Sequence, residues 1–202
     1  MRIESERMDD TEISSDWPAG LYIQPDSPPS ACHWMPVGSP LISGGFEGER
    51  LSVLFGGPHQ SLPSFERAGV KAGDAVYPIR VFRKQMWVLG RMEVGRLLEY
   101  DIAGDYLAME DYLRLVHWKP LKAGCVSEVL VGPPGTPLTF DRPIPGDLLG
   151  RLTYRSRRSE RQIKHVVDGE LLRAVSVHGI YRLAPESAEE LRAVLDHEVS
   201  QP

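Results

Sequence analysis

The chain has little cysteine and no long apolar segment. Its two cysteines, Cys32 and Cys125, lie far apart in 202 residues. One disulfide could join them, but reduced thiols in a cytoplasmic protein agree better with so few cysteines. No run of about 18 apolar residues occurs, so we expect no membrane-spanning helix and no membrane partner. The acidic N-terminal stretch, MRIESERMDDTEISSDW, lacks the basic and then apolar pattern of a signal peptide.

Motifs typical of metal sites and nucleophilic catalysis are also missing. The cysteine and histidine residues are scattered, with no CxxC or HExxH spacing, so we expect no metal site and no cofactor. No Gly-x-Ser-x-Gly motif for a serine nucleophile occurs. The segment Gly132–Pro137 (GPPGTP) lacks the Gly-Lys-Ser/Thr ending that a phosphate-binding loop needs. The sequence therefore identifies no catalytic residue, and leaves open whether the protein is an enzyme.

The composition is that of an ordinary globular protein. Apolar residues make up 42% of the chain and charged residues 25%, which is enough for a hydrophobic core. The net charge of −5 argues against a surface that is basic throughout, although a local basic site remains compatible with it. We expect residues 1–16 to be disordered and residues 17–202 to form one domain. That domain would begin with an extended, proline-rich arm up to Trp34.

The clearest local pattern is the strand–turn–strand segment Gly73–Val94. Alternation gives its first strand an apolar face with Tyr77, Ile79 and Val81. The opposite, mixed face carries Pro78, Arg80 and Phe82. The polar residues 83–85 predict the turn. Because Pro78 cannot donate a hydrogen bond to a neighbouring strand, we expect this strand to lie at a sheet edge or to be bulged at Pro78. Gly90 is a further candidate for a bulge.

This order of a Gly-Asp turn, an apolar strand, a basic turn and a second apolar strand resembles the PUA-like superfamily, which includes ASCH and EVE domains. The resemblance covers residues 51–100. It implies a small mixed β-barrel, a fold in which many members bind RNA, modified bases or nucleotides. ASCH proteins usually carry a Gly-x-Lys-x-x-Glu-x-Arg element before the hairpin, whereas this chain reads SGGFEGERLSVLFGG there and has no lysine. The resemblance therefore implies a fold, but no ribonuclease residue is carried over.

Patterns elsewhere predict further strands and two helices. Asp168-Gly169 between two apolar runs is typical of a β-hairpin, with strands over Ile163–Val167 and Leu171–Val177. A short helix is predicted from Pro145 to Leu152. An apolar stripe, with Ser187 and Glu190 at capping-box spacing, predicts a C-terminal helix over Pro185–Glu198. We therefore expect an α+β fold, a mixed, partly closed β-barrel of PUA-like type with flanking helices and a C-terminal helix.

The basic segment Arg151–His165 stands out from the acidic chain because it holds six basic residues and one acidic residue. Guanidinium groups bind phosphate through two parallel hydrogen bonds, and aromatic rings stack on bases. We predict a ligand-binding site formed by Tyr154, Arg155, Arg157, Arg158, Arg161 and Lys164, with Trp87 as a second stacking ring. A solvated loop paired with acidic neighbours would explain the same charges. A second basic group lies on the central hairpin, at Arg80, Arg83, Lys84 and Arg91.

These features favour a module that binds RNA, a nucleotide or a modified base. Two alternatives stay open. One is a protein–protein interaction module that uses the acidic arm or the C-terminal helix and does not bind nucleic acid. The other is a hydrolase that acts on nucleotides or RNA, for which the missing ASCH lysine is unfavourable.

Overall fold

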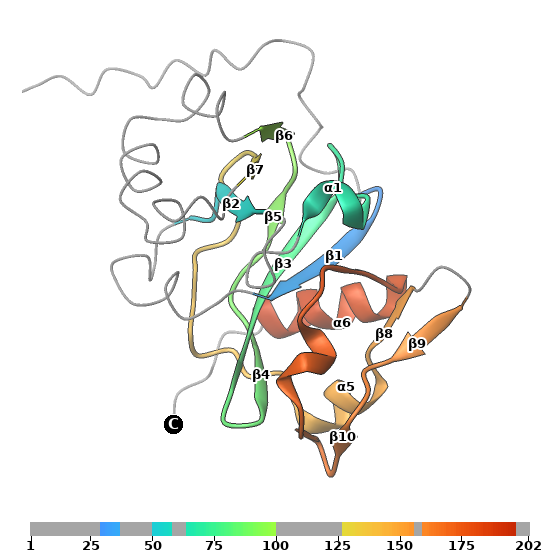
Figure 1. The fold of residues 1–202 in the computed structure, drawn as a ribbon. Helices are drawn as coiled ribbons and strands as arrows, with labels where there is room; N and C mark the ends of the chain where they lie inside the picture. The colour runs from blue at the N-terminus through green and yellow to red at the C-terminus, as the bar shows by residue number, and fades with distance from the viewer. Residues whose placement is uncertain (1–28, 37–49, 58–63, 100–126, 156–158, 197–202) are drawn as a thin grey trace, which may run out of the picture.

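The structure is a computed structural model that describes residues 29–36, 50–57, 64–99, 127–155 and 159–196. These residues form short strands arranged in mixed sheets and a few helices, which is an α+β arrangement (Figure 1). The predictions made for residues 1–16, for most of the N-terminal arm, and for Arg157 and Arg158 lie outside the described residues.

The main sheet is built around the parallel pair β1 (Cys32–Pro36) and β3 (Ala75–Phe82). On the outer side of β3 lie β4 (Gln85–Val88) and β5 (Met92–Glu93), both antiparallel to it. The segment up to Trp34 was predicted to be an extended arm, but its end forms the central strand β1. Trp34 is completely buried, as expected of a residue that holds this segment to the body of the protein.

Three further strands continue the sheet beyond β1. They are β12 (Tyr181–Leu183), β8 (Thr153–Arg155) and β9 (Glu160–Gln162), and each is antiparallel to its neighbour. The resulting order is β4-β3-β1-β12-β8-β9. Within this order β4 and β9 lie at opposite ends.

Pro78 lies in an internal strand, so the prediction of an edge strand was wrong. The predicted bulge is present in the neighbouring strand instead. Ile79 pairs with Val88 but Val76 pairs with Met92, so four residue steps of the neighbour match three steps of β3. The extra residue falls between β4 and β5, where Gly90 lies.

Two smaller sheets complete the strand structure. β7 (Glu128–Val131) lies between β2 (Val53–Gly56) and β6 (Arg96–Glu99), antiparallel to both. β10 (Val166–Val167) and β11 (Glu170–Leu171) form the hairpin that was predicted around Asp168-Gly169. The second strand of that hairpin ends early, because residues Ala174–Val177 form a 3-10 helix.

The three described α-helices begin in different ways. α1 (Phe65–Ala68) is capped by Ser64, and the carboxylate of Glu128 also accepts from the backbone N–H of Phe65 at 2.6 Å. α5 (Gly146–Arg151) follows Pro145, close to its predicted span. α6 (Pro185–Asp196) confirms the C-terminal helix. Its predicted capping box does not form, because the helix starts at Pro185 and Ser187 lies within it.

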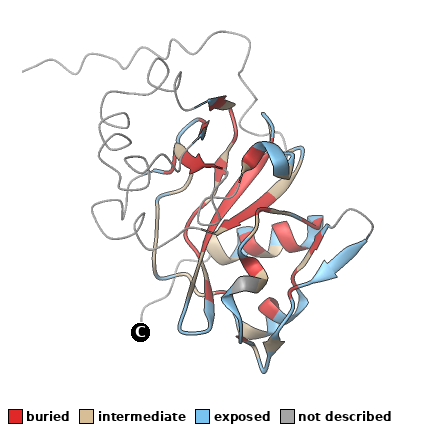
Figure 2. Ribbon diagram, viewed as in Figure 1, coloured by how far each residue is buried: buried red, intermediate tan, exposed pale blue. Residues whose placement is uncertain are grey.

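Apolar side chains pack on both faces of the β1–β3 pair. Figure 2 shows both strands buried along most of their length. One face, which carries Trp34, Tyr77 and Ile79, packs against residues of α5 and α6. The opposite face carries Met35 and Val76, which pack with residues that include Phe65 of α1 and Leu130 of β7. The alternation predicted for β3 is thereby confirmed. Strand pairing among the described residues gives three separate sheets, so the partly closed barrel stays a prediction.

Candidate functional site

The β3–β4 hairpin presents an aromatic ring between two guanidinium groups. Phe82 is 44% exposed. The Cζ atom of Arg80 lies 4.9 Å from its ring centroid, and that of Arg83 lies 5.1 Å away. Arg83 and Lys84 form the two-residue turn with positive φ angles of 49° and 64°, as in hairpin turns that match the strand twist. The turn therefore fixes Phe82 and Arg83 at the end of two paired strands.

Trp87 lies on the same face of this hairpin. It is directly opposite Arg80 in the β3–β4 register, and Gln85 is opposite Phe82. Its side chain is partly exposed. The indole Nε1 is buried and has no hydrogen-bond partner among the described residues. Trp87 therefore lies on the same hairpin as Phe82. The other predicted site residues that the structure describes lie outside this hairpin.

The β10–β11 hairpin lies beside the β3–β4 turn. The backbone N–H of Leu171 donates to the carbonyl of Lys84 at 2.8 Å, and the Lys84 ammonium pairs with Glu170 at 3.0 Å. The predicted residue Lys164 is exposed and precedes β10 by two positions. Lys164 therefore lies in the turn that leads into the hairpin that contacts the β3–β4 turn.

Tyr154 is in the core, although it was predicted to stack on a ligand. It is 7% exposed, and its ring packs against Trp34 and Tyr181 with centroid distances of 5.3 Å and 4.6 Å. Both contacts belong to the apolar cluster under α6. This burial argues against a stacking role, because no face of the ring is open to a base.

The described arginines of the basic segment lie on α5, β8 and β9, and most have acidic partners. Arg155 pairs with Glu160 across the two strands at 3.9 Å. Arg151 contacts Glu190 of α6 and Asp147 of α5, both at 2.7 Å. The hydrogen bond from Arg151 holds the pKa of Asp147 below its usual value, and the bond to Glu190 raises the pKa of Arg151. Arg161 is exposed on β9.

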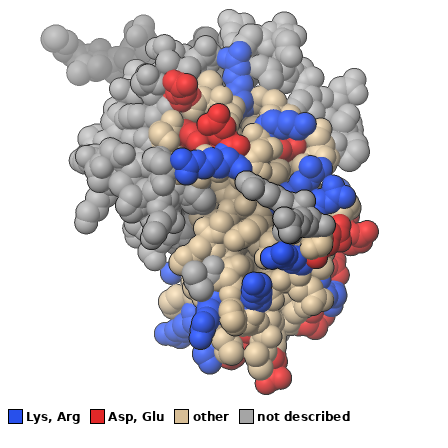
Figure 3. Space-filling view, turned by 45° about the vertical axis from the view of Figure 1, so that its right-hand side comes forward, with Lys and Arg blue, Asp and Glu red and all other residues tan. Residues whose placement is uncertain are grey.

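The structure therefore does not unite the predicted residues in one site. Trp87 is on β4 and Arg161 is on β9, at opposite ends of the strand order. Figure 3 shows basic side chains distributed over this view of the surface with acidic ones between them. Sequence analysis had placed Phe82 on the correct face without assigning it a role. Its position next to a basic turn was the signal that could have identified it.

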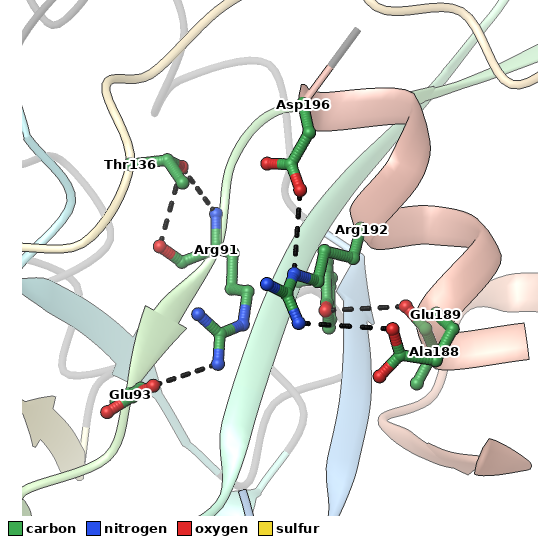
Figure 4. Close-up of polar contacts among 8 residues, drawn as sticks. Arg91, Glu93, Thr136, Ala188, Glu189, Arg192 and Asp196 are labelled. Carbon is green, nitrogen blue, oxygen red and sulfur yellow. Dashed lines mark hydrogen bonds and ion pairs between the residues drawn. The ribbon is translucent and has the colours of Figure 1, made fainter. Parts of the chain in front are cut away.

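A second polar cluster lies on the α6-facing side of the main sheet (Figure 4). The Arg91 Nη2 atom donates to Glu93 at 2.8 Å, and the backbone N–H of Arg91 donates to the Thr136 hydroxyl at 2.8 Å. The Tyr77 hydroxyl donates to the carbonyl of Ala188 in α6 at 3.4 Å. Arg192 of α6 lies near Glu189 and Asp196 of the same helix.

Burial controls the ionisation of two side chains on this side of the sheet, the Cys32 thiol and the Tyr77 hydroxyl. Burial raises the pKa of the Cys32 thiol, and the positive charge of Arg91 opposes this only in part. Burial likewise raises the pKa of the Tyr77 hydroxyl far above its ordinary value. Both groups are therefore neutral near pH 7. Because a reactive cysteine needs a lowered pKa, the cluster does not contain an activated nucleophile.

Sequence analysis missed a buried His33–Asp74 pair. The Nε2 atom of His33 lies 3.1 Å from Asp74 Oδ2, which also accepts from the backbone N–H of Lys71 at 3.1 Å. His33 is 1% exposed and Asp74 is fully buried. The pair joins β1 to the start of β3, and its burial gives it a structural role. No local sequence signal links two residues that are 41 positions apart.

Neither a group of metal-ligand side chains nor a membrane-spanning helix is present among the residues that the structure describes. Within those residues no group of three histidine, cysteine or acidic side chains is placed to hold a metal ion. No helix in the same set is long and apolar enough to cross a membrane.

Comparison with known proteins identifies no family for this chain. No family model matches it, and no curated protein matches it. Among solved structures, a mutant of the ZmASCH protein from Zymomonas mobilis aligns with 83% of this chain and 99% of its own, with 13% identity and a TM-score of 0.39. So low a score carries no argument about fold or function.

Proposed function

We propose that the protein binds single-stranded RNA or a nucleotide, and that the face of the β3–β4 hairpin with Arg80, Phe82 and Arg83 makes the contact. The exposed Phe82 ring between two guanidinium groups is the observation that carries this proposal. An exposed aromatic ring stacks on any base, and neighbouring arginines contact the phosphates on either side of it. The hairpin supplies both chemistries within one turn.

Nearby residues extend this surface. Trp87 provides a second ring on the same face, and Lys164 provides a cation from the adjoining hairpin. Arg155, Arg157, Arg158 and Arg161 remain proposed phosphate contacts for a longer strand. Tyr154 has no part in this proposal because its ring is buried. On the basis of the sequence resemblance, we propose that the protein has a PUA-like, partly closed barrel fold and that this surface lies on it.

Fluorescence anisotropy with labelled single-stranded RNA and DNA, measured over a salt series, tests the proposal. Phosphate contacts predict that affinity falls as salt rises. Phe82→Ala should weaken binding about 10-fold, since stacking contributes roughly 1–3 kcal/mol per base. Arg80→Glu with Arg83→Glu should weaken binding further and should reduce the salt dependence.

Arg67→Glu is the control because it makes the same charge change as each of the two hairpin substitutions, but on α1, at the other end of the molecule from the β3–β4 turn (Figure 1). It should leave binding nearly unchanged. Loss of binding in Arg157→Glu/Arg158→Glu without loss in Phe82→Ala would place the site on the basic segment and contradict the hairpin proposal. Absence of binding at low salt would contradict nucleic-acid binding and favour a protein partner.

A further inference from the structure

Two arginines on the α6-facing side of the main sheet have buried, unpaired guanidinium nitrogens. Arg91 Nε lacks a hydrogen-bond partner among the described residues, and so do Nε and Nη1 of Arg142. Glu93 accepts only from Nη2 of Arg91. The nearest acid to Arg142 is Asp141, 3.6 Å from Nε, and this carboxylate already accepts from the Thr139 hydroxyl. Three guanidinium nitrogens are therefore left without an acceptor among the described residues.

The strand pairing places both arginines along one edge of the sheet. Val88 N donates to the carbonyl of Arg142 at 3.0 Å, and Thr136 N donates to the carbonyl of Arg91 at 2.9 Å. The segment from Thr136 to Ile144 therefore runs beside β4 and its extension. Arg142 is opposite Val88, on the face where Val88 and Ile144 enter the core.

Arg91 is on that same face. Its charge acts on both Cys32 and Tyr77, which are part of or packed against the same apolar cluster. A third arginine, Arg192, approaches from α6, and its charge also acts on Tyr77. Figure 4 shows Arg91 beside β3 and Arg192 extending from α6 toward the sheet. The Arg192 contacts to Glu189 and Asp196 are long, at 3.9 Å and 3.5 Å, so its donors are not saturated.

The carboxylates beside the three arginines offset part of their charge, but they leave the unpaired nitrogens without an acceptor. Burying a guanidinium N–H without an acceptor costs more than burying a neutral donor, and cations near one another repel. One anion between them relieves both costs. A planar carboxylate offers two oxygens in one plane, whereas a phosphate offers three oxygens in different directions and so can accept from several arginines.

We infer that Arg91, Arg142 and Arg192 form a binding site for a phosphate group, between the edge of the main sheet and α6. Arg91 and Arg142 supply the fixed N–H donors, and Arg192 closes over the anion from the helix. The partly buried Cys32 thiol and the Tyr77 hydroxyl lie in the same cluster as neutral neighbours. The site is on the opposite face of the sheet from Phe82, so it does not depend on the proposed RNA contact.

Thermal unfolding of the whole protein, with phosphate and with chloride at equal ionic strength, tests the site. Phosphate at about 100 times its Kd should raise the Tm by about 5 °C. The increase should be mostly lost in Arg91→Lys and in Arg142→Lys, which keep the charge but remove the planar fork. Arg182→Gln, on the exposed side of β12, is the control and should keep the full increase.

Alkylation of Cys32 gives a second measurement that does not depend on variants of the arginines. In a Cys125→Ser background, phosphate should slow alkylation of Cys32 several-fold relative to chloride. This experiment decides the question if an arginine variant does not fold. Equal Tm increases in all variants, or an unchanged alkylation rate, would overturn the inference.

The same alkylation assay distinguishes a free phosphate from the end of a nucleic acid. The probes are inorganic phosphate and two short RNAs of one sequence, with a 5′-phosphate or a 5′-hydroxyl. Protection by the 5′-phosphate RNA but not by the 5′-hydroxyl RNA assigns a terminal nucleotide phosphate. Protection by inorganic phosphate alone assigns a small free anion. Protection by none of them overturns the site, while the Phe82 experiment remains independent.

Discussion

At the scale of single residues, burial decides how the ionisable groups behave. Tyr77 is 1% exposed, and its hydroxyl donates to the carbonyl of Ala188 at the long distance of 3.4 Å. Burial without a strong partner disfavours the charged form, which raises the pKa of the Tyr77 hydroxyl. Deprotonation of an exposed tyrosine would leave the stability of the protein unchanged, whereas deprotonation of the buried Tyr77 hydroxyl changes it.

We expect Tyr77 to destabilise the protein in alkaline solution. Below the ordinary tyrosine pKa of about 10 both states keep the proton, and stability is unaffected. As the pH rises past about 10, the unfolded chain loses the proton first, so the free energy of unfolding falls by about 1.4 kcal/mol per pH unit. Tyr77→Phe removes this proton and should flatten the decline. Urea unfolding at about pH 8 and at about pH 10.5 measures the difference.

Tyr181→Phe is the control for this measurement. Burial also raises the pKa of Tyr181, but the residue is only partly buried, so its substitution should have a smaller effect. An equal alkaline decline in wild type and Tyr77→Phe would show that Tyr77 does not retain its proton in the folded protein.

At the scale of elements, the β10–β11 hairpin depends on a close contact between two glycines. Gly169 has a φ of +78°, a conformation that disfavours side chains. A Cβ atom built on Gly169 would lie 2.8 Å from the Cα of Gly146, at the start of α5. The turn that the sequence predicted locally is therefore also fixed by packing against a helix.

Gly169→Ala should destabilise the protein by roughly 1–3 kcal/mol, because it adds backbone strain to a steric clash. Gly150→Ala is the matched control. Gly150 lies within α5 and has open space around its Cβ position, so alanine there should stabilise by about 0.5–1 kcal/mol. Chemical denaturation of both variants compares the two changes. A neutral Gly169→Ala would mean that the hairpin moves away from α5 at little cost.

At the scale of the whole molecule, the β1–β3 pair carries one apolar cluster on each face. Adjacent residues of β1 divide between them, with Trp34 in the cluster under α6 and Met35 in the cluster on the opposite face. Loss of either cluster would expose an apolar face of the same two strands. We therefore expect the two clusters to unfold together.

Met35→Ala tests this coupling. Met35 is fully buried, so its truncation should cost about 2–5 kcal/mol. Near-UV circular dichroism, to which Trp34, Tyr154 and Tyr181 contribute from the other face, should show the same shift in denaturation midpoint as the far-UV signal. Transitions that separate in the variant would show that the two faces unfold independently.

The features that depend on short-range patterns could be predicted from the amino-acid sequence. The alternating faces of β3, the turn at Arg83-Lys84, the Asp168-Gly169 turn and the α6 stripe all follow from residues within a few positions of one another. Their physical basis is the fixed period of strands and helices and the backbone preferences of turns. Such patterns also placed Phe82 on the face of β3 opposite Tyr77 and Ile79.

Long-range packing determines which strands are internal and which charged groups remain unpaired, and the sequence did not predict either. Pairing on both sides made β1 and β3 internal strands, although Pro78 suggested an edge. Packing against Trp34 and Tyr181 buried Tyr154. Strand order separated Trp87 from Arg161 and brought Arg142 alongside the strand that leads to Arg91. These outcomes depend on contacts between residues that are far apart in the chain, and no local pattern encodes such contacts.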